Sequence, residues 1–308
     1  NATARIDSLL KNKFFIILQG DMSDPFFLND IISKHKVDYI FNLAAMSHVK
    51  TSFDIPEYTT DVNALGTLRI LEAIRLLNLN KKVRFYQAST SELYGNTKKI
   101  PQDENTKFYP RSPYAVSKLF SYWIIKNYRE AYGIHASNGI LFNHESPRRG
   151  ETFVTRKITM FFAKKILGSR DVLYLGNLNA KRDWGHAKDF VEMQWRILQT
   201  KKPDDYVIAT GKTYTVREFI ETACKFIGFK IFWKGKGLKE IGYIINKNNK
   251  KDTIIKIDKK YFRPNEVDYL RGDARKAYKK LNFKPKYNFE KLVKEMMAED
   301  ISSLRNMV

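Results

Sequence analysis

The sequence of 308 residues has a single cysteine, Cys224, so no disulfide can form within one chain. A lone cysteine is typical of a reducing compartment, and we expect a cytoplasmic protein. No apolar run approaches the ~20 residues that a membrane-spanning helix needs, and residues 1–13 lack the apolar core of a signal peptide. The five histidines are scattered without ligand spacing, so we expect no metal site. These absences favour a globular protein without membrane, disulfide or metal.

Acidic residues are also scarce: 33 Asp and Glu stand against 55 Lys and Arg, which gives a net charge of +22. Such a balance can indicate nucleic-acid binding. The lysines are spread along the chain, however, and concentrate near its C-terminal half, as in residues 234–240 and 246–252, where many are replaceable surface positions. We therefore expect no nucleic-acid partner, and we expect the charge to attract a small polyanionic substrate. A nucleic-acid-binding protein would instead show steeply salt-dependent binding.

Short apolar runs alternate with helical patterns over the first half of the chain. The runs 14–21, 37–45, 83–90 and 139–143 predict buried strands, and apolar residues at i, i+3, i+4 spacing predict helices over 24–35 and 59–77. A longer helix is predicted between Ser112 as N-cap, with Pro113 at its first position, and Gly133 at its end. This alternation predicts an α/β fold, a Rossmann-type doubly wound parallel sheet.

The alternation weakens after about residue 145. Helices are predicted over 155–168 and from about Thr215 to 228, with short strands and a lysine-rich loop near 246–252. We expect a dinucleotide-binding domain over 1–145 and a smaller α/β substrate-binding portion over 146–308, with some of its segments returning to the first domain.

A glycine fingerprint is missing. A dinucleotide-binding domain normally opens with a strand that runs into G-x-x-G-x-x-G, where backbone N–H groups hold the pyrophosphate. The sequence contains no such stretch, and residues 1–10 would follow that unit. We expect the first strand–helix unit to lie outside this sequence; the alternative is a protein that has lost cofactor binding.

Tyr114 and Lys118 stand four apart on one face of the helix predicted from Ser112. An ammonium beside a phenol favours the phenolate, so the pair can take a hydroxyl proton while hydride leaves the same carbon. The spacing alone fits a surface pair equally well. Upstream, Ser89, Thr90, Ser91 and Glu92 end a predicted strand, where α/β sheets bind ligands. These four could instead be a helix cap, but with Tyr-x-x-x-Lys they suit the active site of a short-chain dehydrogenase/reductase.

With these motifs the chain resembles the GDP-mannose 4,6-dehydratase family of extended short-chain dehydrogenases/reductases. The stretches that carry the resemblance run in order through most of the chain: 43–49, 85–95, 108–118, 138–159, 182–189, 204–211 and 261–268. The sequence departs from the family by lacking its opening. That part holds the glycine fingerprint and an arginine-rich stretch that helps assemble tetramers and bind the 2′-phosphate of NADP.

The resemblance implies NADP as cofactor, GDP-mannose as substrate, and a homodimer or homotetramer. The implied reaction is C4 oxidation, loss of water across C5–C6 and hydride return to C6, giving GDP-4-keto-6-deoxymannose. The implied catalytic residues are Thr90, Glu92, Tyr114 and Lys118. The implied cofactor-binding residues are Asp21, Met22, Leu43, Ala44, Ala45, Met46, Ser47, Tyr58, Tyr114, Lys118, His144 and Arg149. The implied substrate-binding residues are Ser47, Thr90, Ser91, Glu92, Asn143, Val154, Lys157, Arg182, Arg263 and Glu266.

Several of these residues also have plain structural interpretations. His144 taken alone is better explained as a hydrogen-bonded structural histidine. Arg182 and Arg263 suit phosphate oxygens through forked donors, although each could equally be a surface charge or an ion-pair partner.

Other functions stay open at this point. A GDP-heptose dehydratase needs only slight widening around C6. Dehydratases of dTDP-glucose usually carry Asp where this chain has Ser91, and epimerases have no need of Glu92. A non-catalytic nucleotide-sugar sensor or scaffold would have no reason to keep Thr90, Glu92, Tyr114 and Lys118 together.

Overall fold

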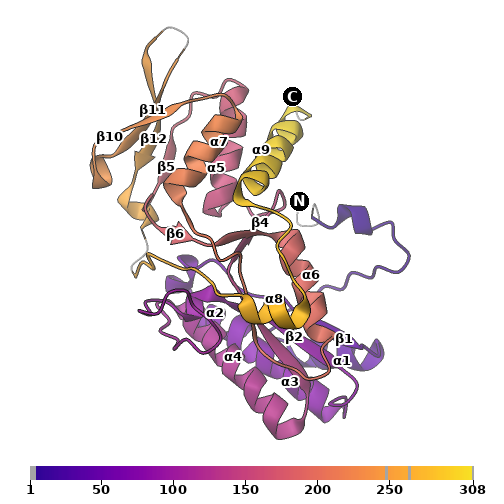
Figure 1. Cartoon of the computed structure of the whole chain (residues 1–308). Coiled ribbons are helices and arrows are strands. Elements are labelled where there is room, and N and C mark those ends of the chain that lie inside the picture. Colours follow the sequence, from indigo (N-terminus) through magenta and orange to yellow (C-terminus); the bar gives the residue numbers. More distant parts are fainter. Residues whose placement is uncertain (1–4, 247–248, 263–264, 307–308) are drawn as a thin grey trace.

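The computed structural model describes residues 5–246, 249–262 and 265–306. Its lower portion in Figure 1 is built on a parallel four-stranded sheet in the order β1-β2-β3-β8. The strands are β1 (Tyr39–Asn42), β2 (Arg84–Thr90), β3 (His135–Leu141) and β8 (Tyr206–Ile208). Parallel strands joined through helices confirm the predicted Rossmann-type α/β fold.

Helices cover both faces of this sheet, because successive side chains of a strand point to opposite faces. Phe85 of β2 packs under α3 and α4, while its neighbour Tyr86 packs under α6 and α8. The helices of this portion are α1 (Pro25–Lys34), α2 (Pro56–Thr60), α3 (Gly66–Leu76), α4 (Pro113–Tyr132), α6 (Ala187–Leu198) and α8 (Arg275–Leu281). The α4 boundaries confirm the sequence prediction: the Ser112 hydroxyl accepts a hydrogen bond from Ala115 N, and Gly133 adopts φ +65°.

The strand predicted over 14–21 is absent from the structure. Phe14 and Ile16 are 84% and 66% exposed, and no strand of the described residues pairs with this segment. A strand needs a neighbour for its backbone N–H and C=O groups, and β1 is the edge of the described sheet. An apolar composition alone therefore could not make this segment a strand.

Two other predicted elements are interrupted. The helix predicted over 59–77 divides into α2, a π turn over Asp61–Leu65 and α3. The strand predicted over 139–143 divides at Phe142, after which β4 (Asn143–Glu145) pairs with β7 (Trp184–His186) instead of continuing β3. The π turn carries Asn63, and β4 carries Asn143 and His144.

The upper portion in Figure 1 contains a second sheet in the order β10-β11-β12-β5. Its strands are β5 (Leu173–Leu175), β10 (Ile231–Lys234), β11 (Ile241–Ile245) and β12 (Lys251–Ile257). Its helices are α5 (Val154–Ile166), α7 (Val216–Phe226) and α9 (Phe289–Arg305), and they share one core with the sheet. A capping box between Thr215 and Glu218 begins α7. In the predicted loop 246–252, residues 247 and 248 lie outside the described residues and β12 begins at Lys251.

The two portions are joined by chain segments that run from the upper portion back to the lower one. Strand β8 and helices α6 and α8 come from beyond residue 145 yet complete the lower portion. The boundary at 145 stays a prediction. A short sheet of β6 (Lys181–Arg182) and β9 (Tyr214–Thr215) lies between the portions in Figure 1. Among the described residues, no helix is long and apolar enough to cross a membrane.

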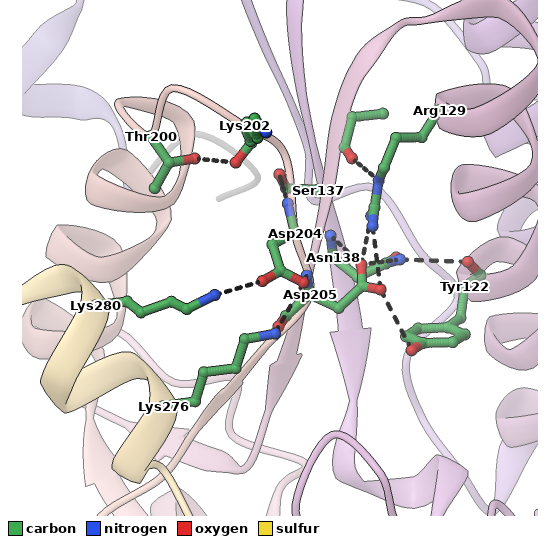
Figure 2. Close-up of polar contacts among 11 residues, drawn as sticks. Tyr122, Arg129, Ser137, Asn138, Thr200, Lys202, Asp204, Asp205, Lys276 and Lys280 are labelled. Atoms are coloured by element: carbon green, nitrogen blue, oxygen red, sulfur yellow. Dashed lines mark hydrogen bonds and ion pairs between the residues drawn. The ribbon is translucent and has the colours of Figure 1, made fainter.

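A buried ion pair fastens α4 to the end of the sheet. Arg129 of α4 lies 2.5 Å from a carboxylate oxygen of Asp205, which precedes β8. Figure 2 shows the same carboxylate accepting from Tyr122 and from the amide of Asn138, at 3.4 and 2.9 Å. Removing one partner of a buried ion pair typically costs about 3–5 kcal/mol, because the other charge is left without compensation. The pair therefore fixes the C-terminal end of α4 against the start of β8.

Candidate active site

The site begins where β2 ends. Thr90 is the last residue of the strand, and its hydroxyl accepts a hydrogen bond of 3.2 Å from Glu92 N at the start of the 3₁₀ turn Ser91–Leu93. The helix-cap interpretation is therefore correct for Thr90. It does not remove these residues from the site, because Thr90, Ser91 and Glu92 are all buried at the carboxyl end of a parallel strand.

Tyr114 and Lys118 lie in the first turns of α4 and are not a surface pair. Their exposed fractions are 9% and 2%. The Tyr114 hydroxyl hydrogen-bonds the Thr90 side chain, and Glu92 is close enough to act on its charge. Lys118 Nζ donates to Ala88 O at 2.9 Å. The structure thus brings the four predicted catalytic residues together at one strand end.

The pKa of Tyr114 is raised in the structure, whereas the sequence predicted that it would be lowered. Burial raises the pKa of Tyr114 to about 12, with the Thr90 hydrogen bond and the charge of Arg149 acting in the opposite direction. The prediction that Lys118 lowers this pKa is wrong for this structure, because burial dominates and Lys118 Nζ is directed at a backbone carbonyl. Burial also lowers the pKa of Lys118, to about 8.

Asn63 joins this cluster to the loop after β1. Its side-chain oxygen accepts from Met46 N at 2.9 Å, and its amide nitrogen donates to Met46 O and to Ser117 Oγ at 3.2 and 3.0 Å. Sequence reasoning missed Asn63. The available signal was a polar residue among apolar positions of a helical pattern, in the segment that became the π turn.

The predicted cofactor-binding residues after β1 form an accessible loop. Leu43, Ala44 and Ser47 are exposed, and Ala45 and Met46 are half-buried. Tyr58, on α2, is 51% exposed. Such a loop at the carboxyl end of a strand is suited to an extended ligand.

Asp21 and Met22 lie before α1 and contact α3 rather than the Tyr114 cluster. Hydrogen bonds from Ser23 lower the pKa of Asp21, chiefly the bond from its backbone N–H at 2.8 Å. The Met22 carbonyl accepts from Arg69 at 3.0 Å. The structure therefore separates these two from the predicted catalytic residues.

His144 and Arg149 follow β3. The His144 ring stacks on Phe190 with centroids 4.7 Å apart, its Nδ1 lies 2.9 Å from Phe142 O, and burial lowers its pKa to about 4. This neutral, packed ring agrees with the structural interpretation. Arg149 Nε lies 3.1 Å from Glu145, and its charge acts on Tyr114.

These residues fit a nicotinamide dinucleotide. Ser89 Oγ, beside Thr90, is buried without a hydrogen-bond partner, and such an orphaned hydroxyl is costly unless a ligand group pairs with it. Lys118 is an ammonium with three donors, and its bond to Ala88 O leaves capacity for ribose hydroxyls. The accessible loop 43–47 lies at the neighbouring strand end.

Apart from the strand-end residues Ser47, Thr90, Ser91 and Glu92, the predicted substrate residues that the structure describes lie on the upper portion or between the two portions. Arg182 is buried, and its guanidinium lies 3.2 Å from Glu266 Oε1. Lys157 Nζ donates to Tyr174 O at 2.7 Å and lies 3.8 Å from the Tyr261 ring centroid. Burial lowers the pKa of Lys157.

The remaining substrate residues are less constrained. Asn143 lies on β4 beside His144, and Val154 is the first residue of α5. Arg263 lies outside the described residues. Within the described ranges, no group of three His, Cys, Asp or Glu side chains could hold a metal ion.

A family model described as GDP-mannose 4,6 dehydratase matches residues 1–296. A GDP-mannose 4,6 dehydratase of Dictyostelium discoideum is 55% identical over 306 residues, which cover 99% of this chain and 85% of that protein. The human GDP-mannose 4,6 dehydratase is 52% identical over 309 residues, covering 98% and 82%.

Solved structures share the fold at lower identity. A dTDP-glucose 4,6-dehydratase from Bacillus anthracis in complex with NAD has a TM-score of 0.79 at 20% identity, covering 98% of this chain and 85% of that one. RMD from Pseudomonas aeruginosa complexed with NADPH has a TM-score of 0.76 at 21% identity, covering 94% and 89%. These structures support the Rossmann-type fold independently of the sequence pattern.

Proposed function

The chain belongs to the GDP-mannose 4,6 dehydratase family, and we propose that it is an NADP-dependent enzyme that converts GDP-mannose to GDP-4-keto-6-deoxymannose. One observation carries the proposal: the Tyr114 hydroxyl bonds Thr90 and lies within the field of the Glu92 carboxylate, in a buried cluster. Dehydration across C5–C6 needs a base and an acid in addition to the base that takes the C4 hydroxyl proton, and Glu92 supplies that additional group.

Residues 43–47, Tyr58, Ser89 and Lys118 would hold the nicotinamide dinucleotide. When bound, this group accepts hydride from C4 of the sugar and returns it to C6. Arg149 brings positive charge to the same region, and this charge favours the phenolate of Tyr114, whose pKa burial has raised.

Tyr114 takes the proton of the 4-hydroxyl, and Thr90 positions that hydroxyl through its own side chain. Once C4 is a carbonyl, the hydrogen on C5 is acidic, and Glu92 removes it. The carboxylic acid so formed gives its proton to the 6-hydroxyl, which leaves as water. C5 then regains one proton, which balances the proton that Tyr114 took from the 4-hydroxyl. One carboxylate serves both steps because it is buried with the tyrosine and cycles between base and acid.

The upper portion would hold the nucleotide. Arg182 presents a buried guanidinium, which suits forked donation to a diphosphate. Glu266, its present partner at 3.2 Å, would then contact the nucleoside or stay paired beside the phosphate. Asn143, Val154, Lys157 and Arg263 would line the rest of the GDP-sugar site.

We also propose a homodimer in the cytoplasm. Val116, Phe120 and Trp123 are exposed at helical spacing on α4 beside a shallow cavity. Lys126 and Glu130 lie at the edge of that cavity. A second copy related by a two-fold axis would cover the apolar stripe and pair Lys126 of one copy with Glu130 of the other.

The cytoplasm is proposed as the compartment from the single buried thiol of Cys224.

The test is incubation of the full-length protein with NADP⁺ and either GDP-mannose or GDP-heptose, followed by mass spectrometry of the sugar nucleotide. Loss of one water from GDP-mannose is expected. Loss of water from GDP-heptose alone would make GDP-heptose the substrate instead of GDP-mannose. Loss of water from neither would refute the dehydratase proposal.

A further inference from the structure

Residues 265–273, here called the crossing segment, run from the upper portion to the start of α8 (Figure 1). Two side chains bind the beginning of this segment: Arg111 donates to Asn265 at 3.1 Å, and Arg182 bonds Glu266 at 3.2 Å. Further along, Lys181 N donates to Asp268 O at 2.8 Å. The segment therefore touches both the loop before α4 and the strand that carries Arg182.

Asp183, the residue after Arg182, accepts a hydrogen bond from the end of the crossing segment. Its side chain is fully buried. One carboxylate oxygen accepts from Thr210 N and Thr210 Oγ1 at 2.9 and 2.6 Å, and the other accepts from Gly211 N and Gly272 N at 2.8 and 3.2 Å. A single carboxylate thus ties the Arg182 strand to the loop after β8 and to the crossing segment.

Gln102 forms hydrogen bonds with the residues on either side of Gly272, Arg271 and Asp273. It is fully buried and lies in the chain that leads from Glu92 to Tyr114. Its backbone bonds Arg271 O and Asp273 N at 2.8 Å each, and its side-chain oxygen accepts from Arg271 N at 2.9 Å. The side-chain nitrogen has no hydrogen-bond partner, so the oxygen carries the recognition.

We infer that Asp183 and Gln102 are positioning residues: by holding neighbouring residues of the crossing segment, they fix the distance between Arg182 and the Tyr114 cluster. Neither side chain reaches the proposed chemistry itself. Their hydrogen bonds fall on three consecutive residues, 271–273, so a shift of either portion is transmitted to the other.

This inference rests on the proposed function, in which one ligand spans both portions. Arg182 would hold its diphosphate, and Thr90, Glu92 and Tyr114 would act on its sugar. The place of the reacting carbon then depends on how far Arg182 lies from β2 and α4. A displacement of about 1 Å in such a geometry can cost about 10²-fold in rate.

The packing at Gly272 leaves little freedom for an alternative path. A Cβ built on this glycine would lie 2.2 Å from the Cβ of Ala209 and 2.9 Å from the Phe142 ring. The crossing segment is therefore pressed against the chain that follows β8, and the bond to Asp183 fixes it where it is closest.

Two variants test the inference. Asp183→Asn replaces an acceptor oxygen by an amide that faces backbone N–H groups, and Gln102→Met removes one acceptor at nearly constant volume. The control is Asp205→Asn, which weakens a buried carboxylate of comparable bonding that does not touch the crossing segment (Figure 2). If Asp183→Asn fails to fold, Gln102→Met still decides the question.

The measurement is the rate constant of product formation in a single turnover with enzyme in excess over GDP-mannose, which reports geometry, beside a GDP-binding titration whose amplitude counts the folded sites. We expect both test variants to lower the rate constant, Asp183→Asn by about 10²-fold, while the affinity for GDP is unchanged. Asp205→Asn should lower only the amplitude. Loss of amplitude alone in both test variants would overturn the inference.

Amide hydrogen exchange separates this result from failure of the proposed function. A wild type that does not act on GDP-mannose refutes the proposed function only. The inference is then decided by whether GDP slows exchange over 265–273 in the wild type and not in Asp183→Asn. Equal protection in both would overturn it.

Discussion

Replacing Tyr114 by phenylalanine should separate catalysis from stability. The substitution removes one buried hydroxyl and its bond to Thr90, while the ring keeps its packing. A hydrogen bond of this kind contributes about 0.5–1.5 kcal/mol. For a chain of this size that corresponds to a fall in melting temperature of about 1–2 °C.

The kinetic effect should be much larger. General acid–base catalysis contributes about 10²–10⁴-fold, which is about 3–5 kcal/mol of transition-state stabilisation. The assay is the single-turnover rate of NADP⁺ reduction by GDP-mannose, measured beside thermal unfolding of the same preparation. The loss in rate should therefore exceed what the loss in stability can explain.

Tyr94→Phe is the matched control. Tyr94 is fully buried, and its hydroxyl donates to Asp103 O at 2.8 Å, away from Thr90. It should lose similar stability and keep its turnover rate per folded site. A Tyr114→Phe variant that reacts as fast as Tyr94→Phe would refute the role of the Tyr114 hydroxyl.

Three further outcomes are expected. Glu92→Gln should still oxidise C4 slowly but stop before water loss, as shown by nicotinamide absorbance without the 6-deoxy product; undiminished product would exclude Glu92 as the elimination base. Activity should fall as pH rises through about 8, because the buried Lys118, whose pKa is lowered to about 8, loses its proton; Lys118→Arg should move this limb to higher pH, and an unmoved limb would assign it elsewhere. Trp123→Glu on the exposed face of α4 should convert the dimer to a monomer in light scattering, and an unchanged mass would place the interface on another face.

Local signals in the sequence were sufficient for part of the fold. Ser112, Pro113 and Gly133 predicted both ends of α4 because caps act within a few residues of the helix they end. The absence of a strand over 14–21 could not be predicted in the same way. The apolar residues of this segment resemble those of β2, but strand formation depends on a partner that sequence composition does not reveal.

The site divides along the same line. Thr90, Glu92, Tyr114 and Lys118 could be grouped because a strand end and a helix start meet in any parallel α/β sheet. The direction of the Tyr114 pKa could not be predicted, since it follows from burial by distant segments. Asn63, Gln102 and Asp183 were missed for the same reason. Their partners are far away in sequence, as for Gln102 and Arg271.

Isotope tracing tests the central claim most directly. GDP-mannose carrying deuterium at C4 is converted by the chain in the presence of NADP⁺, and the product is analysed by NMR. Internal redox with dehydration predicts that the deuterium is recovered at C6 of the 4-keto-6-deoxy sugar. Deuterium retained at C4, or lost to solvent, would contradict the account.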